Sequence, residues 1–209
     1  MIKYYLITLN LIILDQFLKI YVKTHFKLGQ SIKIFKWFKF FFIENPGIAY
    51  GFNLRFGYLE KIIISIIKTI IIVIFFYFFL KKNNKTSFFF KISICLLFAG
   101  SISNLLDCFF YGIFFNKGVF FKNNTWTGYE GISKFFLKKG YSFFMCGCVV
   151  DMLYFPFFKL IINKNYELII FNIIFNIADI CLSLGVIIFF LCSPGWIRTS
   201  DTLINSQVL

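Results

Sequence analysis

Two aspartates lie in strongly apolar stretches of this sequence. Asp151 falls within the apolar residues 149–156, and Asp179 lies in residues 168–192, three residues after Asn176. An ionisable side chain inside an apolar span costs roughly 2.5 to 3.5 kcal/mol on insertion scales, so each acid calls for an explanation. Two carboxylates held close together at low dielectric cannot both ionise easily, and they share a proton. The ionised member can then take a proton from a water while the other polarises a scissile carbonyl, which is the chemistry of aspartic peptide hydrolysis.

Pro156 indicates how the two aspartates could meet. Because a proline interrupts a regular helix, we expect an irregular loop that lines a protein-walled cavity and brings Asp151 opposite Asp179. A single aspartate at a helix start is more often an N-cap or a salt-bridge partner than a catalyst, and that alternative stays open for each residue taken alone. The paired chemistry needs neither a metal nor a cofactor, and we expect none.

Other polar residues should gather at the same end of an antiparallel helix bundle. Asn104 and Asp107 are three residues apart, and therefore on one helix face, after the small residues 99–101 and Ser103 that permit close helix packing. Packing alone explains this pattern about as well as a role in the site. Asn45 and Gly47 belong to a turn just before the second apolar stretch, and by itself this sequence would indicate only a turn.

The elements that must position these residues follow from hydropathy. With 59% hydrophobic residues, 15% charged residues and a mean hydropathy of +0.81, the chain is predicted to be an integral membrane protein. Four stretches can span a hydrocarbon core of about 30 Å as helices. They cover roughly residues 4–21, 62–80, 88–106 and 168–192.

The first stretch is predicted to be a retained helix, because polar residues interrupt its apolar core and no small-residue cleavage site follows. Within it Asp15 and Lys19 are four residues apart, which favours an intrahelical ion pair that supports the structure. The second and third stretches are joined by a short polar turn and should form an antiparallel hairpin. An even number of spans puts both termini on one side, which we expect to be the cytoplasm because that turn is basic.

The segments between the helices are expected on the periplasmic face. In residues 22–61, alternating apolar residues from Ser31 to Phe42 predict short strands and a small sheet on one membrane face. Residues 107–167 include an insert, residues 108–148, that should pack outside the membrane. Residues 1–192 are therefore predicted to form one membrane domain, followed by a polar and loose tail, residues 193–209.

Charge and cysteine content exclude several other classes. The formal charge of +13 comes from lysines that flank apolar runs, so membrane phospholipids with anionic headgroups are expected partners, and nucleic acid is not. Six cysteines without paired spacing predict no disulfide framework. With His25 as the single histidine, a zinc site or a Ser-His-Asp triad is not expected.

Five short motifs occur in an order that resembles the lipoprotein signal peptidases, or signal peptidase II. They are LDQFLK at 14–19, ENPGIAYG at 44–51, AGSISNLLD at 99–107, VVDMLYFP at 149–156 and FNIAD at 175–179. The resemblance implies a four-helix inner-membrane aspartic protease with a small extracytoplasmic β-cradle. Such enzymes remove signal peptides from lipid-modified prolipoproteins, cutting immediately before the diacylglyceryl-cysteine. The long insert and the wording of the fourth motif resemble the Bacteroidota branch.

The resemblance also implies a role for individual residues. Asp151 and Asp179 match the catalytic pair, and Asp107 matches a supporting acid. The family's substrate-contacting or orienting positions are matched by the motif residues Asn45, Gly47, Asn104 and Asn176, and the first-helix motif by Asp15 and Lys19.

The sequence also departs from the family pattern. Cys108 stands where many relatives have an arginine that would position the substrate backbone, and Ser101 and Ser103 replace common glycines. Two other classes remain as alternatives. A proton- or ion-coupled transport component would also carry intramembrane acids, although no internal repeat supports it. A noncatalytic membrane assembly factor would need no acid pair.

Overall fold

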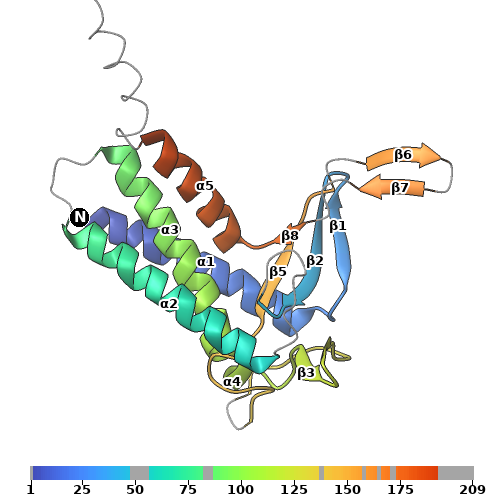
Figure 1. Cartoon of the computed structure of the whole chain (residues 1–209). Helices are drawn as coiled ribbons and strands as arrows, with labels where there is room; N and C mark the ends of the chain where they lie inside the picture. The colour runs from blue at the N-terminus through green and yellow to red at the C-terminus, as the bar shows by residue number, and fades with distance from the viewer. Residues whose placement is uncertain are drawn as a thin grey trace, which may run out of the picture.

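The computed structural model describes residues 2–47, 57–81, 87–136, 139–156, 159–163, 166–169 and 173–192. The predicted tail, most of the turn between the second and third apolar stretches, and the end of the ENPGIAYG motif lie outside these residues. Within the described part the chain folds as a bundle of long helices with a sheet and a small irregular layer beside one end of the bundle (Figure 1).

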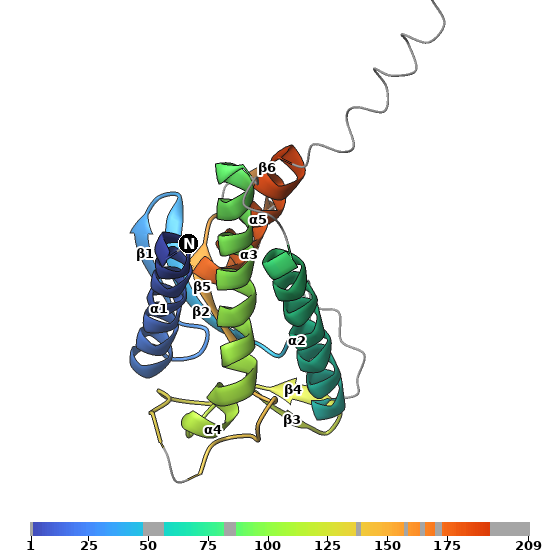
Figure 2. The ribbon, with the colours of Figure 1, turned by 90° about the vertical axis from the view of Figure 1, so that its left-hand side faces the viewer.

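Four long helices form the bundle in the described part of the chain. They are α1 (Ile2–His25), α2 (Tyr58–Lys81), α3 (Phe88–Leu106) and α5 (Ile177–Cys192). Helix α3 packs against the other three, with its most extensive contacts on α5, and it lies between α1 and α2 in Figure 2. The hairpin predicted from the second and third stretches is confirmed, because α2 and α3 are antiparallel neighbours.

Small residues bring α3 and α5 into close contact. A Cβ atom at Gly100 would lie 2.4 Å from the carbonyl oxygen of Ala178, and one at Gly185 would lie 2.9 Å from Leu97 Cγ. Any larger side chain at Gly100 would push the start of α5 away from α3, because backbone atoms cannot give way cheaply. The close helix packing expected from residues 99–103 is therefore present at Gly100.

The bounds of three predicted helices need correction. Helix α2 begins at Tyr58, four residues before its predicted start. Helix α1 continues to His25, four residues past the predicted end, because Lys23 faces the protein interior and not solvent. The predicted helix at 168–192 begins only at Ile177, since residues 166–169 and 174–175 form strands. A continuous apolar run is compatible with both a helix and a buried strand, so hydropathy alone missed this boundary.

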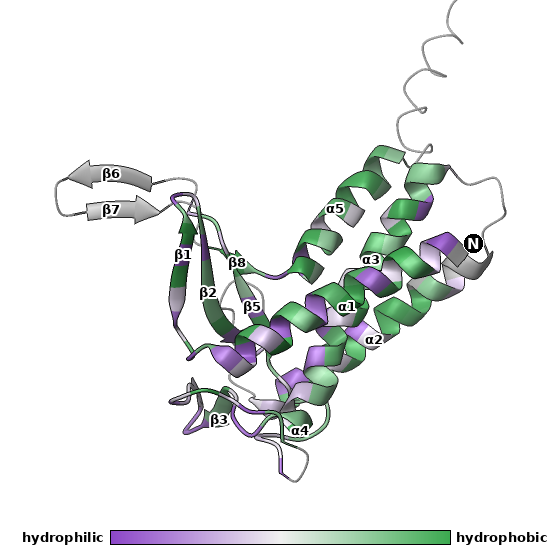
Figure 3. Ribbon diagram, turned by 180° about the vertical axis from the view of Figure 1, so that it is seen from behind, coloured by the Kyte–Doolittle hydropathy of each residue, from purple (hydrophilic) through white to green (hydrophobic). Residues whose placement is uncertain are grey.

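Beyond Leu106 the third helix continues in altered form. Asp107–Tyr111 form a π-helical turn and Gly112–Phe114 one α-helical turn, α4. Among the described residues, two helices are long and apolar enough to cross a membrane, Lys3–His25 and Phe88–Phe114, and α5 is a shorter apolar helix. Figure 3 shows that the long helices are largely hydrophobic, while polar residues gather near α4 and β3.

A four-stranded antiparallel sheet lies beside the bundle, in the order β1-β2-β5-β8. Its strands are β1 (Ser31–Phe35), β2 (Phe38–Asn45), β5 (Val149–Tyr154) and β8 (Ile174–Phe175). The alternation predicted from Ser31 to Phe42 is confirmed as β1 and β2. Every residue of β5 is buried, as expected for a central strand that is covered on both faces.

The predicted loop around Asp151 is wrong, because Asp151 lies in the regular strand β5. There it pairs with Ile43 of β2. Pro156 ends the strand rather than disrupting it, as it lies two residues beyond Tyr154.

Two hairpins complete the described strands. One joins β3 (Phe120–Lys122) to β4 (Thr125–Thr127) through Asn123 and Asn124, which have φ values of 51° and 58°. Asparagine tolerates this left-handed conformation, which two-residue hairpin turns require. The other joins β6 (Lys159–Asn163) to β7 (Tyr166–Ile169) and projects past the sheet in Figure 1.

The buried hydrophobic core lies where the end of α1, the sheet and the insert meet. It contains, among others, Val22, Phe42, Phe115, Val150 and Met152. This core packs β5 against α1 and the π-helical turn after α3, and so fixes the strand that carries Asp151.

Candidate active site

Asp151 is held on a rigid, buried support. Its side chain is 3% exposed, and its strand lies between β2 and β8 at the centre of the sheet. The neighbouring Val150 donates its backbone N–H to Asp107 Oδ2 at 3.3 Å, which ties β5 to the end of α3. The backbone at Asp151 is therefore fixed by both the sheet ladder and a helix carboxylate.

Asp179 lies in the first turn of α5, in a reciprocal capping arrangement with Asn176. The backbone N–H of Asp179 donates to Asn176 Oδ1 at 2.9 Å, and the backbone N–H of Asn176 donates to Asp179 Oδ2 at 3.2 Å. This is a capping box, with Asn176 as the N-cap residue and Asp179 three positions later. The three-residue spacing therefore brings the two side chains together, although Asn176 precedes the helix rather than lying on its face.

Asn176 also binds Asp151. Its side-chain amide donates to Asp151 Oδ1 at 2.6 Å, and to the carbonyl oxygen of Val150 and Asn104 Oδ1 at 3.3 Å each. Since the same residue caps Asp179, one fully buried asparagine holds both aspartates. Asn104 supplies a second link by donating its Nδ2 to Asp179 Oδ1 at 2.9 Å.

A buried charge cluster orients these asparagines from α1. Lys19 Nζ donates to Asn104 Oδ1 at 2.8 Å and forms ion pairs of 2.8 Å with both Asp15 and Asp107. The predicted Asp15–Lys19 ion pair is thereby confirmed. Because Lys19 fixes the Asn104 oxygen, the Asn104 amide nitrogen is left to face Asp179.

Asp15 also reaches the start of α5. Its Oδ1 accepts the backbone N–H of Ala178 at 2.9 Å, and its Oδ2 accepts the Ser103 hydroxyl at 2.5 Å. A carboxylate at a helix N-terminus satisfies an otherwise unpaired N–H and favours the positive end of the helix dipole. Asp15 thus anchors the turn that carries Asp179.

The electrostatics of the pair favour a proton on Asp151. Burial raises the pKa of the Asp151 carboxyl to about 8, and the nearby charge of Asp179 contributes in the same direction. Asp151 is therefore protonated at neutral pH. Asp179 is only partly buried and accepts two N–H groups, an environment that suits a carboxylate.

Asn45 and Gly47 lie in a turn one strand away from Asp151, and within the described part of the chain neither forms a hydrogen bond with Asp151 or Asp179. Asn45 pairs with Val149 on β5, two residues from Asp151, and its Oδ1 accepts the Gly47 N–H at 3.0 Å. Gly47 has a φ of +119°, a backbone conformation that residues other than glycine rarely adopt. The structure thus places Asn45 near the pair through the β2–β5 register, and Gly47 shapes the turn.

A second buried ion pair was not predicted from the sequence. Lys23 of α1 pairs with Glu44 of β2, and both are buried. Glu44 also accepts the backbone N–H of Val119 at 3.0 Å and the hydroxyl of Tyr129 at 2.7 Å, both from the insert. Burial and Glu44 raise the pKa of Tyr129, so its hydroxyl remains a donor.

Glu44 directly precedes Asn45, so its bonds to Lys23 and to the insert hold the strand that leads into the Asn45 turn. Lys23 Nζ also lies 5.0 Å from the ring centroid of Phe115 and 5.1 Å from that of Tyr141. The sequence signal for this pair was Glu44, an acidic residue directly after the apolar run 40–43.

Known proteins are similar to this chain in sequence and in fold. The family described as signal peptidase (SPase) II matches residues 7–194. Lipoprotein signal peptidases of two Porphyromonas gingivalis strains, ATCC 33277 and W83, are each 32% identical over 207 residues, which cover 94% of this chain and 84% of theirs. Porphyromonas belongs to the Bacteroidota, so the predicted branch is confirmed along with the family.

Solved structures agree with these matches. A bacterial membrane enzyme solved by the in meso method at 1.9 Å resolution superimposes with a TM-score of 0.58 at 25% identity, covering 90% of each chain. A second, at 2.3 Å resolution, shares the fold with a TM-score of 0.57 at 22% identity, covering 98% of this chain and 90% of its own. With a family match across most of its length and a relative 32% identical over 94% of it, this chain belongs to the signal peptidase II family.

Proposed function

We propose that Asp151 and Asp179 are the catalytic pair with which this chain hydrolyses its substrate. As a member of its family, the chain is an aspartic endopeptidase that removes signal peptides from prolipoproteins. The observation that carries the assignment is the buried Asn176, which binds Asp151 through its amide and forms a capping box with Asp179. An asparagine with contacts to both acids keeps them in one site.

The two acids have different roles in the reaction. Asp179, as the carboxylate, accepts a proton from a water molecule whose oxygen attacks the scissile carbonyl carbon. Asp151 donates its proton to the carbonyl oxygen, so the tetrahedral intermediate carries no net oxyanion. The intermediate then collapses as the amide nitrogen receives a proton from Asp179 and one hydroxyl of the intermediate returns its proton to Asp151. The C–N bond breaks to give a new carboxyl group and a free amine, and both aspartates regain their starting protonation states.

Within this proposal the asparagines and the turn contact or orient the substrate. Asn104 and Asn176 hold the aspartates at a fixed separation, and Asn45 and Gly47 offer polar groups beside β5 for the extended substrate backbone. Cleavage falls before the diacylglyceryl-cysteine, so the lipid remains on the mature lipoprotein. The buried Asp107 and the Asp15–Lys19 ion pair support the asparagines without touching substrate.

We also propose the placement of the chain in the bacterial inner membrane. Helices α1, α2, α3 and α5 are the four spans, the sheet is a cradle on the periplasmic face with the insert, and both termini are cytoplasmic. The 24-residue α1 and α2 are about 36 Å long at 1.5 Å per residue, enough to cross the hydrocarbon core. Apolar side chains of α1 and α2 exposed on the outside of the bundle, such as Phe17 and Val73, would contact phospholipid chains.

Replacement of each carboxylate tests the catalytic assignment. Asp151→Asn and Asp179→Asn should each lower the rate of cleavage of a diacylglyceryl prolipoprotein by at least about a thousand-fold, as expected for groups that act only in the transition state. Glu130→Gln makes the same change on an exposed carboxylate of the insert and should leave cleavage unchanged. Thermal unfolding in detergent checks that each variant is folded, and normal cleavage by either aspartate variant would falsify the assignment.

A further inference from the structure

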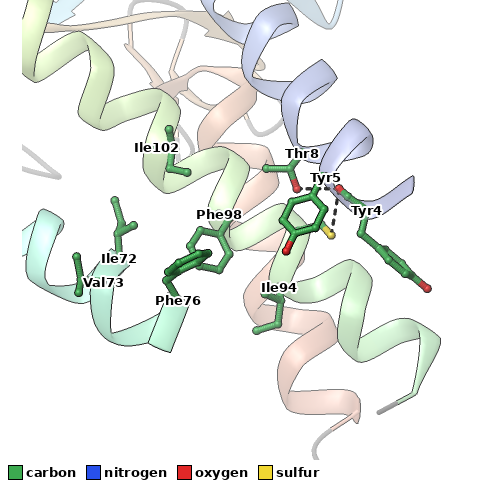
Figure 4. A pocket seen from close by; sticks show the side chains of 10 residues that line it. Tyr4, Tyr5, Thr8, Ile72, Val73, Phe76, Ile94, Phe98 and Ile102 are labelled. Carbon is green, nitrogen blue, oxygen red and sulfur yellow. Dashed lines mark hydrogen bonds between the residues drawn. The ribbon is translucent and has the colours of Figure 1, made fainter. Parts of the chain in front are cut away.

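An apolar cavity lies between α1, α2 and α3, at the end of the bundle that carries the N-terminus. It has a volume of about 320 Å³. Its walls are formed by ten residues, shown in Figure 4: Tyr4, Tyr5, Thr8, Ile72, Val73, Phe76, Ile94, Cys95, Phe98 and Ile102. The buried groups of the catalytic site begin two turns further along α1, at Asp15. The cavity is therefore distinct from the site of hydrolysis.

The walls of the cavity are almost entirely apolar. The Thr8 hydroxyl donates to the carbonyl oxygen of Tyr4 at 3.1 Å, and the Cys95 thiol points at the same oxygen at 3.6 Å (Figure 4). Apart from the hydroxyls at the ends of the Tyr4 and Tyr5 rings, the remaining lining is hydrocarbon and aromatic ring. Such a cavity stays dry or holds an apolar group.

The cavity opens to the outer surface of the helix bundle. Three of its lining side chains are about half exposed, Tyr5 at 51%, Val73 at 60% and Phe76 at 45%. In the membrane these side chains face lipid, so a lipid chain has direct lateral access. An acyl chain is the apolar group present at the highest concentration there.

Positive charge is concentrated at the N-terminal end of the cavity. Lys3 Nζ lies 5.3 Å and Lys91 Nζ lies 5.9 Å from the ring centroid of Tyr4, which itself lines the cavity. Lys91 precedes the lining residues Ile94 and Cys95 by one turn of α3, on the same helix face.

No acidic residue offsets this charge in the described first turns of the two helices. Both α1 and α3 begin here, so their positive dipole ends add to the two ammonium groups. A tyrosine ring at this level is typical of the membrane interface, where lipid headgroups lie. The cavity therefore combines an apolar slot with a cationic rim.

We propose that this cavity binds one anionic phospholipid, with an acyl chain in the slot and the headgroup phosphate between Lys3 and Lys91. The inference rests on the proposed membrane placement and is independent of the catalytic pair. A zwitterionic lipid would fill the slot equally well, but its own cation would oppose the two lysines. Charge complementarity thus selects an anionic headgroup.

Native mass spectrometry of the intact enzyme in detergent tests this site with two lipids of identical chains, phosphatidylglycerol and phosphatidylcholine. Each lysine near a headgroup contributes about five-fold in affinity, so the wild type should retain phosphatidylglycerol about 25-fold more tightly. Lys3→Gln combined with Lys91→Gln should abolish that preference. Lys122→Gln combined with Lys134→Gln, two exposed lysines of the insert, is the matched control and should preserve it.

A third variant tests the slot itself. Val73→Trp places a large ring at the exposed mouth and should lower the retention of both lipids. Equal retention of the two lipids by the wild type, a preference that survives in the Lys3 and Lys91 double variant, or unchanged binding to Val73→Trp would each overturn the proposal. The lysine double variant should still cleave prolipoprotein in lipid-free detergent, so loss of lipid binding is separable from failure of the catalytic assignment.

Discussion

Replacing Asp151 by asparagine should stabilise the folded chain at neutral pH while it removes activity. In the folded state the pKa of Asp151 is raised from 3.8 to about 8, mainly by burial. Between these values the folded state binds a proton that the unfolded state has released. The free energy of unfolding therefore falls as pH rises, by up to about 1.4 kcal/mol per pH unit, or about 3 kcal/mol between pH 5 and pH 7.

Thermal unfolding in one detergent at a series of pH values measures this effect. The isosteric Asp151→Asn variant has no proton to lose, so its melting temperature should fall less than that of the wild type from pH 5 to pH 8. Other titrating groups are common to both proteins and cancel in the difference. Asp179→Asn provides the second comparison: it removes the smaller cause of the raised pKa, so the pH dependence should persist but end at a lower pH.

Parallel melting curves for the wild type and Asp151→Asn across this range would refute the raised pKa, and with it the protonated role of Asp151. The same protonation predicts a limit on activity. Cleavage should decline as the pH rises through about 8, where Asp151 loses the proton it donates to the scissile carbonyl.

Two further changes test the supports of the site. Gly100→Ala should destabilise the chain by about 1 to 3 kcal/mol and lower cleavage, because the new Cβ would meet the Ala178 carbonyl at the start of α5. Ser101→Ala, at the next residue, is the control. Equal stability of the two variants would contradict close packing of α3 against α5 at Gly100. Glu44→Leu should cost about 3 to 5 kcal/mol by leaving Lys23 buried without a partner, whereas Glu44→Leu combined with Lys23→Met should cost less. Additive losses in unfolding measurements would show that the two residues are not coupled.

Much of the bundle and the site could be predicted from local patterns. Alternation from Ser31 to Phe42 predicted β1 and β2, and the four-residue spacing of Asp15 and Lys19 predicted their ion pair. Spacing of three residues also placed Asn104 and Asp107 on one face. Both do contact Lys19, and Asn104 reaches Asp179 as well. Such patterns work because they depend on the repeat of a single helix or strand.

The remaining features depend on partners that are distant in sequence. Asp151 lies in a regular strand because β2 and β8 pair with β5 on its two sides. In sequence, β2 is more than a hundred residues from β5 and β8 is about twenty residues from it, so a local pattern cannot predict either pairing. The buried Lys23–Glu44 pair likewise depends on the insert, which encloses it with Tyr129. Neither arrangement can be predicted from the repeat of a single helix or strand.

Asn176 resolves the choice between a structural and a catalytic aspartate at the start of α5. Asp179 is part of a capping box, which is the structural role that a lone aspartate at a helix start would suggest. The cap does not exclude catalysis, since it leaves Asp179 Oδ1 bound only through Asn104 in the described contacts and fixes the carboxylate orientation. Because the capping asparagine also donates to Asp151, the bonds that begin the helix are the bonds that position the pair. Catalytic geometry here is thus a consequence of how α5 is capped, and a variant that weakens the cap should lose activity before it loses its fold.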